Sequence, residues 1–277
     1  MEPIAHLRLV EKSEPPEYDE QTLKVHNENS GRYAADALRC IELDKVGSFC
    51  GNIHDLGKAT KKFLDYIQPG NTLRRGEVNH TFAAVRYIFE LSDGVDNEVR
   101  ELLAYAVGAH HGQFDTVNDD HKNGFEHRLT KDGIDYGEAK KNFNEHCFSD
   151  AELKSQFDEA AEQLANIIEG IRERNPKRSA RQAEEYEFQI SLLARLLLSA
   201  VIEGDRRDTA EFMENMKFPQ VEANWDKCLG HIEKKLGEFS NARPIDGARK
   251  QISDICRAAA EEEPGIFRLN VPTGAGK

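Results

Sequence analysis

The sequence predicts a mainly α-helical protein, for two reasons. Apolar residues recur at helical spacing through most of the chain, as at Phe49, Ile53 and Leu56. Alternating runs of β-branched residues, which are typical of strands, are few. The 277 residues are enough for one large domain or two modest ones.

The expected helices cover residues 22–43, 46–67, 78–92, 97–111, 149–173, 182–203, 208–215, 220–240 and 243–262. Pro69 and Gly70 end the second of these helices. Asp208 and Glu211 have the spacing of a capping box, which predicts that a new helix begins there. Residues 112–148 are polar and lack sustained periodicity, so we expect a long irregular excursion. Residues 266–271 alternate in polarity and predict a short C-terminal strand-like segment.

The composition limits the classes of function. With 37 basic and 50 acidic residues the net charge is −13, which argues against a broadly basic nucleic-acid-binding surface. A local site with bound cations remains compatible with that charge. The most apolar stretch, residues 190–202, contains Arg195 and is shorter than the roughly 20 residues that a membrane span needs. No membrane association is expected.

The N-terminus and the cysteines indicate the compartment. No basic segment followed by an apolar one appears near residue 1, so the expected location is cytoplasmic. The 5 cysteines are scattered and never form a Cys-x-x-Cys pair. This pattern favours reduced thiols over a disulfide framework or a structural zinc site.

Histidines and aspartates in helical contexts form the candidate site. They are His26, His54, Asp55, His80, His110, His111 and Asp205. Imidazoles combined with carboxylates suit transition metals, whereas magnesium and calcium prefer oxygen ligands. Asp55 lies about 100° from His54 on a helix, so its carboxylate could share one ion with His54 or bridge two. Lys58 falls on the same face and would position water or a phosphate, or else is an ordinary solvated lysine.

The last residues resemble the start of a phosphate-binding loop. A strand-like segment leads into glycines and a lysine, as where backbone N–H groups and Lys hold ATP phosphates. The residues expected to contact ATP in the full-length protein are Thr273, Gly274, Gly276 and Lys277. The Ser or Thr and the helix that normally follow are absent, and Val271 stands at the place of the first glycine. We therefore expect a chain cut within a larger protein and unable to bind or hydrolyse ATP alone.

The segment Ile53-His54-Asp55-Leu56-Gly57-Lys58, together with His26 and Asp205, resembles the H…HD…D pattern of the HD phosphohydrolase superfamily. Three further segments make the resemblance more specific: Asn79-His80, Ala109-His110-His111-Gly112 and Gly204-Asp205-Arg206-Arg207-Asp208-Thr209. With them the chain resembles the HD nuclease domain of the CRISPR-associated helicase-nuclease of type I systems. The terminal segment is similar to motif I of that family's superfamily-two helicase.

The resemblance implies an HD-superfamily helical domain over residues 1–242, followed by a linker and the truncated start of a helicase domain over 243–277. It implies that His26, His54, Asp55 and Asp205 hold one metal ion. Asp55, His80, His110 and His111 would hold a second, with Asp55 bridging. Manganese, iron, cobalt or nickel are the expected ions, and His54, Asp55 and Lys58 the expected catalytic residues.

Two sets of residues stand outside this pattern. Glu203 and Gly204 precede Asp205, where the family more often has a pair of small residues. This departure concerns the geometry of the local backbone and not the identity of Asp205 as a ligand. Five histidines match nothing in the motif and are expected to be surface or structural residues: His6, His121, His127, His146 and His231. Of these, His121 and His127 are the ones considered for substrate contact.

The first functional hypothesis is a metal-dependent nuclease that cuts single-stranded DNA, delivered by the helicase, in type I CRISPR interference. Its expected partners are single-stranded DNA, the CRISPR surveillance complex and inhibitor proteins. Phosphate contacts are expected from Lys61, Lys62, Arg206, Arg207 and a basic cluster comprising Arg172, Arg174, Lys177, Arg178 and Arg181. For the cluster, the alternative is an ordinary solvated surface. The alternative functions are a phosphohydrolase of nucleotides or cyclic nucleotides, and a non-catalytic docking module.

Overall fold

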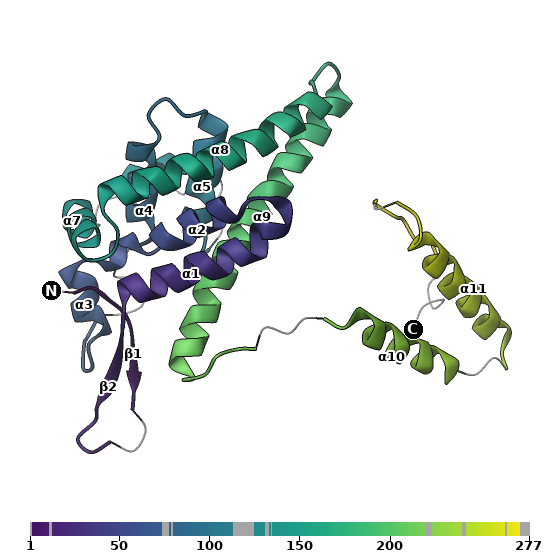
Figure 1. Ribbon diagram of the computed structural model, residues 1–277, viewed down its shortest axis with the longest axis horizontal. Coiled ribbons are helices and arrows are strands. Elements are labelled where there is room, and N and C mark those ends of the chain that lie inside the picture. Colours follow the sequence, from purple (N-terminus) through teal and green to yellow (C-terminus); the bar gives the residue numbers. More distant parts are fainter. Residues whose placement is uncertain are drawn as a thin grey trace. The chain divides into compact units, whose positions relative to one another are not determined.

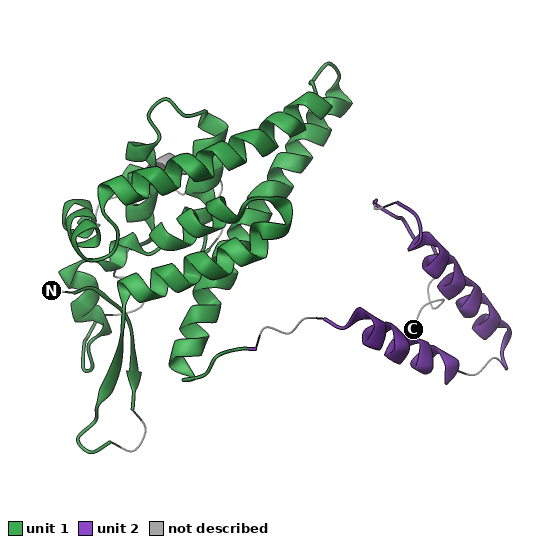
Figure 2. Cartoon of the chain, viewed as in Figure 1, with its two compact units in different colours: residues 1–218 green, residues 219–277 purple. Residues whose placement is uncertain are grey.

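The computed structural model describes residues 2–10, 13–73, 78, 80–112, 125–130, 133, 135–219, 223–239, 242–263 and 265–271. It divides the chain into two compact units, Met1–Phe218 and Pro219–Lys277 (Figure 2). Helices dominate both, so the prediction of a mainly α fold is confirmed. The units divide before the expected boundary at residue 242, and the assignment of the second to a helicase stays a prediction.

Unit 1 begins with a hairpin of two strands, β1 (Ile4–Leu9) and β2 (Tyr18–Thr22), and continues as helices. The α-helices of this unit are α1 (Leu23–Leu38), α2 (Asp44–Ile53), α3 (Lys61–Ile67), α4 (Thr81–Leu91), α5 (Asn97–Gly108), α6 (Phe125–Thr130), α7 (Tyr136–His146), α8 (Asp150–Arg174) and α9 (Ala180–Met213). Short 3₁₀ turns, η1 (Arg39–Ile41) and η2 (Leu56–Lys58), follow α1 and α2.

Helices α1, α2 and α9 of unit 1 pack against one another, and α9 runs along one side (Figure 1). The backbones of α1 and α2 meet where Gly31 faces Gly51, and a Cβ atom added to Gly51 would lie 2.5 Å from the Cα of Gly31. Only glycine allows so close a crossing. Helix α8 covers α2 on another side, where Phe49 and Phe157 pack edge to face with ring centroids 5.5 Å apart.

The expected helix over 46–67 is interrupted. Helix α2 ends at Ile53, η2 follows, and α3 begins after Thr60, whose hydroxyl accepts a hydrogen bond from the backbone N–H of Phe63. This N-cap explains the restart, because a Thr oxygen satisfies one of the free N–H groups of the first turn. The break places His54 and Asp55 at a helix end rather than mid-helix.

The predicted helix start at Asp208 is wrong. Residues 180–213 form one continuous helix, α9, and both Asp208 and Glu211 are buried inside it. Their carboxylates accept hydrogen bonds from side chains of α1 and β2 instead of capping a new helix. The apparent capping box was therefore a pair of inward-facing acids at helical spacing.

Two other expectations need correction. The region 112–148 contains α6 and α7, and Phe143 of α7 is fully buried, so it is not wholly irregular. The described residues 265–271 form no strand, since no neighbouring strand there supplies backbone partners. The strands lie instead at the N-terminus, where the guanidinium of Arg8 donates to the carbonyl of Phe212 at 2.7 Å and ties the hairpin to α9.

Unit 2 contains α10 (Trp225–Gly237) and α11 (Pro244–Ala259). An ion pair of 2.5 Å between Arg257 and Glu233 links the two helices. Within the part of the chain that the structure describes, no helix has the length and apolar character that crossing a membrane requires.

Candidate metal centre

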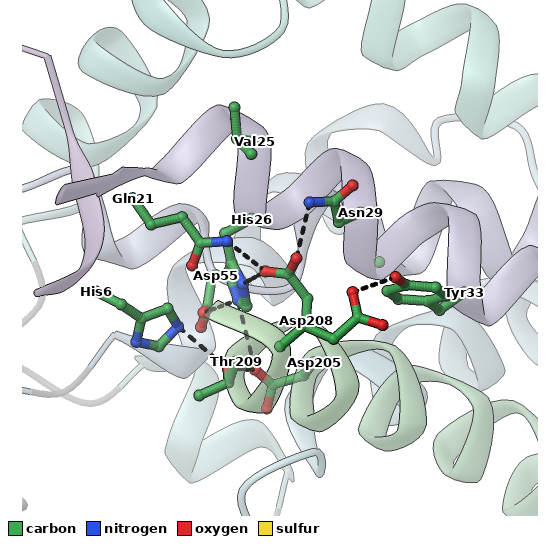
Figure 3. Close-up of polar contacts among 12 residues, drawn as sticks. His6, Gln21, Val25, His26, Asn29, Tyr33, Asp55, Asp205, Asp208 and Thr209 are labelled. Carbon is green, nitrogen blue, oxygen red and sulfur yellow. Dashed lines mark hydrogen bonds and ion pairs between the residues drawn. The ribbon is translucent and has the colours of Figure 1, made fainter. Parts of the chain in front are cut away.

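Four side chains from three helical segments meet in the centre of unit 1. His26 comes from α1, His54 and Asp55 from the end of α2, and Asp205 from α9. One ligand atom from each lies within 4.8 Å of all the others. Figure 3 shows His26, Asp55 and Asp205 converging beside α9.

A second group adjoins the first through Asp55. It contains Asp55, His110 and His111, whose ligand atoms also lie within 4.8 Å of one another. His80 joins it, because its Nε2 lies 2.9 Å from Nε2 of His111 and 3.9 Å from Oδ1 of Asp55. All seven side chains named from the sequence therefore meet in one region.

The two oxygens of Asp55 face different groups. Oδ2 lies 3.3 Å from Nε2 of His26 and 3.3 Å from Nε2 of His54. Oδ1 lies 3.7 Å from Nε2 of His110 and 3.9 Å from Nε2 of His80. This arrangement suits a carboxylate that bridges two cations, one on each side.

Hydrogen bonds at Nδ1 orient the three deepest imidazoles. Nδ1 of His54 donates to the carbonyl of Gly51 at 2.7 Å, and Nδ1 of His110 donates to that of Val107 at 2.5 Å. Nδ1 of His26 donates to Oδ2 of Asp208 at 2.7 Å. Because carbonyls and carboxylates only accept, each Nδ1 carries a proton and leaves Nε2 to point into the site.

Several inward-pointing atoms have no hydrogen-bond partner. They are Nε2 of His26, His54 and His110, and Oδ1 of Asp55, whereas Oδ2 of Asp55 forms an ion pair with Lys58. Burying polar atoms without partners is costly, and their convergence on one point fits a cation that would accept their lone pairs. The donor set of imidazoles and carboxylates is typical of manganese, iron, cobalt, nickel or zinc.

The electrostatics of the protein without bound ions reflect this crowding. Burial opposes ionisation of Asp55, yet Lys58 and the neighbouring histidines hold the pKa of Asp55 well below its usual range. Burial likewise opposes the charge on His54, but Asp55 and Asp205 raise the pKa of His54 to about 10. Burial lowers the pKa of His80 to about 4. The imidazole of His80 is thus neutral at pH 7, as a metal ligand must be.

Lys58 contacts the carboxylate of Asp55, and Gly204 sets the distance between α9 and α1. The ammonium of Lys58, predicted to face the site, is buried and lies 2.6 Å from Oδ2 of Asp55. A Cβ atom on Gly204 would lie 2.3 Å from the carbonyl oxygen of Ser30. Glycine at this position lets α9 approach α1 closely enough to bring Asp205 to 3.4 Å from His26. The unusual residue before Asp205 therefore has a structural reason.

Sequence reasoning missed three residues beside the site. Asp208 was assigned to a helix cap, but it contacts His26. His6 was assigned to the surface or structure, yet its ring packs edge-on against His26 with centroids 4.7 Å apart, and burial lowers its pKa to about 2. Nε2 of His6 lies 3.2 Å from the hydroxyl of Thr209, which donates to Asp205 at 3.5 Å. The one available signal was the spacing of Asp205 and Asp208, which share a helix face.

The remaining candidates are the basic cluster, the residues expected to contact ATP, and the histidines considered for substrate contact. Arg172 of the basic cluster pairs with Asp96 and Glu98, and Arg181 with Glu185, at the end of α8 and α9 opposite the hairpin (Figure 1). These pairings favour the interpretation as an ordinary surface. Thr273, Gly274, Gly276, Lys277 and His121 lie outside the described residues, as does the side chain of His127.

The helical framework and its cluster of histidines and aspartates define a domain of the HD type. A family model described as "Cas3, HD domain" matches residues 21–202, and the chain belongs to this family of metal-dependent HD nucleases. The match ends before Asp205 and begins after His6. None of the curated proteins compared with the chain matches it.

Proposed function

We propose that this protein hydrolyses phosphodiester bonds of single-stranded DNA with two divalent transition-metal ions, in type I CRISPR interference. The observation that carries the proposal is the orientation of Asp55, whose two oxygens face two groups of imidazoles. Two cations sharing a carboxylate suit in-line displacement at a phosphodiester. Membership of the Cas3 HD family supports the same chemistry.

In this proposal His26, His54, Asp55 and Asp205 would hold one ion, and Asp55, His80, His110 and His111 the other. Bound ions of this kind activate water and stabilise negative charge on phosphate oxygens. The protein contributes the fixed orientation of the imidazoles and the charge of Lys58. Manganese, iron, cobalt or nickel remain the proposed ions.

The exposure of the ligands indicates how a substrate reaches them. The side chains of His26, His54 and His110 are fully buried, whereas His111 is exposed and those of His80 and Asp205 remain partly so. A phosphodiester would therefore approach over His111, His80 and Asp205.

Cations near this approach would hold the DNA backbone. Arg206, adjacent to Asp205, and Lys62 are exposed and make no ion pair among the residues that the structure describes. Lys61 and Arg207, by contrast, pair with Asp65 and Glu211. Arg206 and Lys62 are therefore the better candidates for phosphate contacts.

The wider setting is also proposed. The partners would be a helicase that delivers the strand, the CRISPR surveillance complex and inhibitor proteins, in the cytoplasm. Residues 1–242 would act as the nuclease domain, and 243–277 would lead into the helicase, where ATP binds in the full-length protein.

The proposal is tested by Mn²⁺-dependent cleavage of a labelled single-stranded oligonucleotide. His54→Ala and Asp55→Ala should abolish cleavage, whereas His146→Ala, outside the site in the same unit, should retain it. Cleavage that survives in both site variants would refute the assignment. Faster turnover of a cyclic nucleotide than of the oligonucleotide would favour the phosphohydrolase alternative, and a reconstituted protein without bound metal would favour a docking module.

A further inference from the structure

Asp208 is a buried carboxylate with three hydrogen-bond donors around it. Oδ2 accepts from Nε2 of Gln21 and from Nδ1 of His26, both at 2.7 Å. Oδ1 accepts from Nδ2 of Asn29, also at 2.7 Å. Gln21 belongs to β2 and Asn29 to α1, so the hairpin and α1 hold the carboxylate from two directions (Figure 3).

Asp205 and Asp208 contact opposite sides of one imidazole. They lie one turn apart on α9, and Oδ1 of Asp205 is 3.4 Å from Nε2 of His26 while Asp208 binds Nδ1. Of the three deepest histidines, His54 and His110 are oriented by backbone carbonyls, which no substitution removes. The orientation of His26 alone depends on a side chain.

We propose that Asp208 is a positioning residue of the metal centre, which keeps the Nδ1 proton on His26 and turns its Nε2 lone pair toward Asp55 and Asp205. The inference rests on the proposed metal centre. The hairpin thereby contributes to the metal centre, because Gln21 of β2 donates a hydrogen bond to Asp208.

The carboxylate is needed because of the three donors. An asparagine at position 208 has one accepting oxygen and one N–H₂ group, and the latter would face a donor. If that donor is His26, the imidazole must move its proton to Nε2 or rotate. Either change removes the lone pair that a metal ion needs.

The test compares Asp208→Asn with Glu211→Gln in the 277-residue chain. Glu211 is the matched control because it is a buried carboxylate on the next turn of α9 and contacts Tyr33 and Lys217, not His26. Isothermal titration with Mn²⁺ should show roughly 10–100-fold weaker binding in Asp208→Asn, the usual loss on removing an outer partner of a metal ligand. Glu211→Gln should bind Mn²⁺ as the wild type does.

A second measurement tests the hydrogen bond without metal. The wild-type protein should show a downfield proton resonance from Nδ1–H of His26, identified by its loss in His26→Gln, and Asp208→Asn should lose it. A lower melting temperature of Asp208→Asn with unchanged Mn²⁺ affinity would overturn the inference and leave the metal centre intact. A wild-type protein that keeps the resonance but binds no Mn²⁺ would refute the metal centre itself, and this inference with it.

Discussion

The ammonium of Lys58 lies 2.6 Å from the same oxygen of Asp55 that faces His26 and His54. In the protein without metal, Lys58 therefore compensates a fully buried carboxylate. A divalent cation bound at that oxygen would lie close to the ammonium, and the two positive charges would repel each other.

Replacing Lys58 should separate metal binding from catalysis. Lys58→Met removes the repulsion, so Mn²⁺ should bind roughly tenfold more tightly, equivalent to about 1.4 kcal/mol. DNA cleavage should nevertheless fall by about 10²-fold, since the proposed function assigns to Lys58 a charge that would stabilise the reacting phosphate. Lys61→Met, which removes an exposed lysine paired with Asp65, is the control for titration and cleavage. Weaker Mn²⁺ binding in Lys58→Met would contradict the prediction.

The shared position of Asp55 predicts the metal stoichiometry. His110→Ala should lose the ion on the Oδ1 side and retain one ion near wild-type affinity. Asp55→Asn should weaken both sites, by at least the ~10–100-fold that loss of an outer partner costs. Equilibrium dialysis with elemental analysis measures both variants, and equal stoichiometry in the two would rule out a bridging role.

The close approach of α9 to α1 can be tested at Gly204. Gly204→Ala would push a methyl group against the backbone of Ser30, which should cost about 1–3 kcal/mol in the free energy of unfolding. The displacement of Asp205 should also weaken Mn²⁺ binding. Gly170→Ala in α8 is the control, because its Cβ would make only an ordinary contact with Arg174. Urea denaturation and Mn²⁺ titration of both variants provide the measurements, and equal stability of the two would disprove the steric argument.

Glu211 predicts part of the acid sensitivity. Burial raises its pKa, but hydrogen bonds from Lys217 and Tyr33 outweigh burial and lower the pKa from 4.5 to about 2. Because the folded-state pKa lies below the unfolded value, this stabilisation is complete above about pH 5 and is lost as the pH falls toward 2. Glu211→Gln should be about 1–3 kcal/mol less stable at pH 7.

The difference between the wild type and Glu211→Gln should shrink as the pH is lowered from 5 to 2. Denaturation with a chelator present measures it without bound metal. A difference that stays constant over this range would show that the charge of Glu211 does not stabilise the fold.

Local signals in the sequence were sufficient for most helices of unit 1. The start of α1 at Leu23, the end of α3 after Ile67 and the extent of α8 follow from apolar spacing and from residues at helix ends. The errors at Asp208 and at the break after Ile53 have different causes. Asp208 accepts hydrogen bonds from residues far away in the sequence, and periodicity carries no record of such contacts. The break was missed because apolar periodicity runs through it, although Thr60 caps the new helix locally.

The seven candidate ligands were identified from residue type and motif, because imidazole and carboxylate chemistry is a property of each side chain alone. Tertiary structure decided how they are held. His26 and Asp208 are 182 positions apart, and His6 reaches the site from a hairpin with a weak strand signal. The contact between His26 and Asp208 also needs the close approach of α9 to α1 that Gly204 allows, and a distance between packed helices is set by the whole core rather than by any local run of residues.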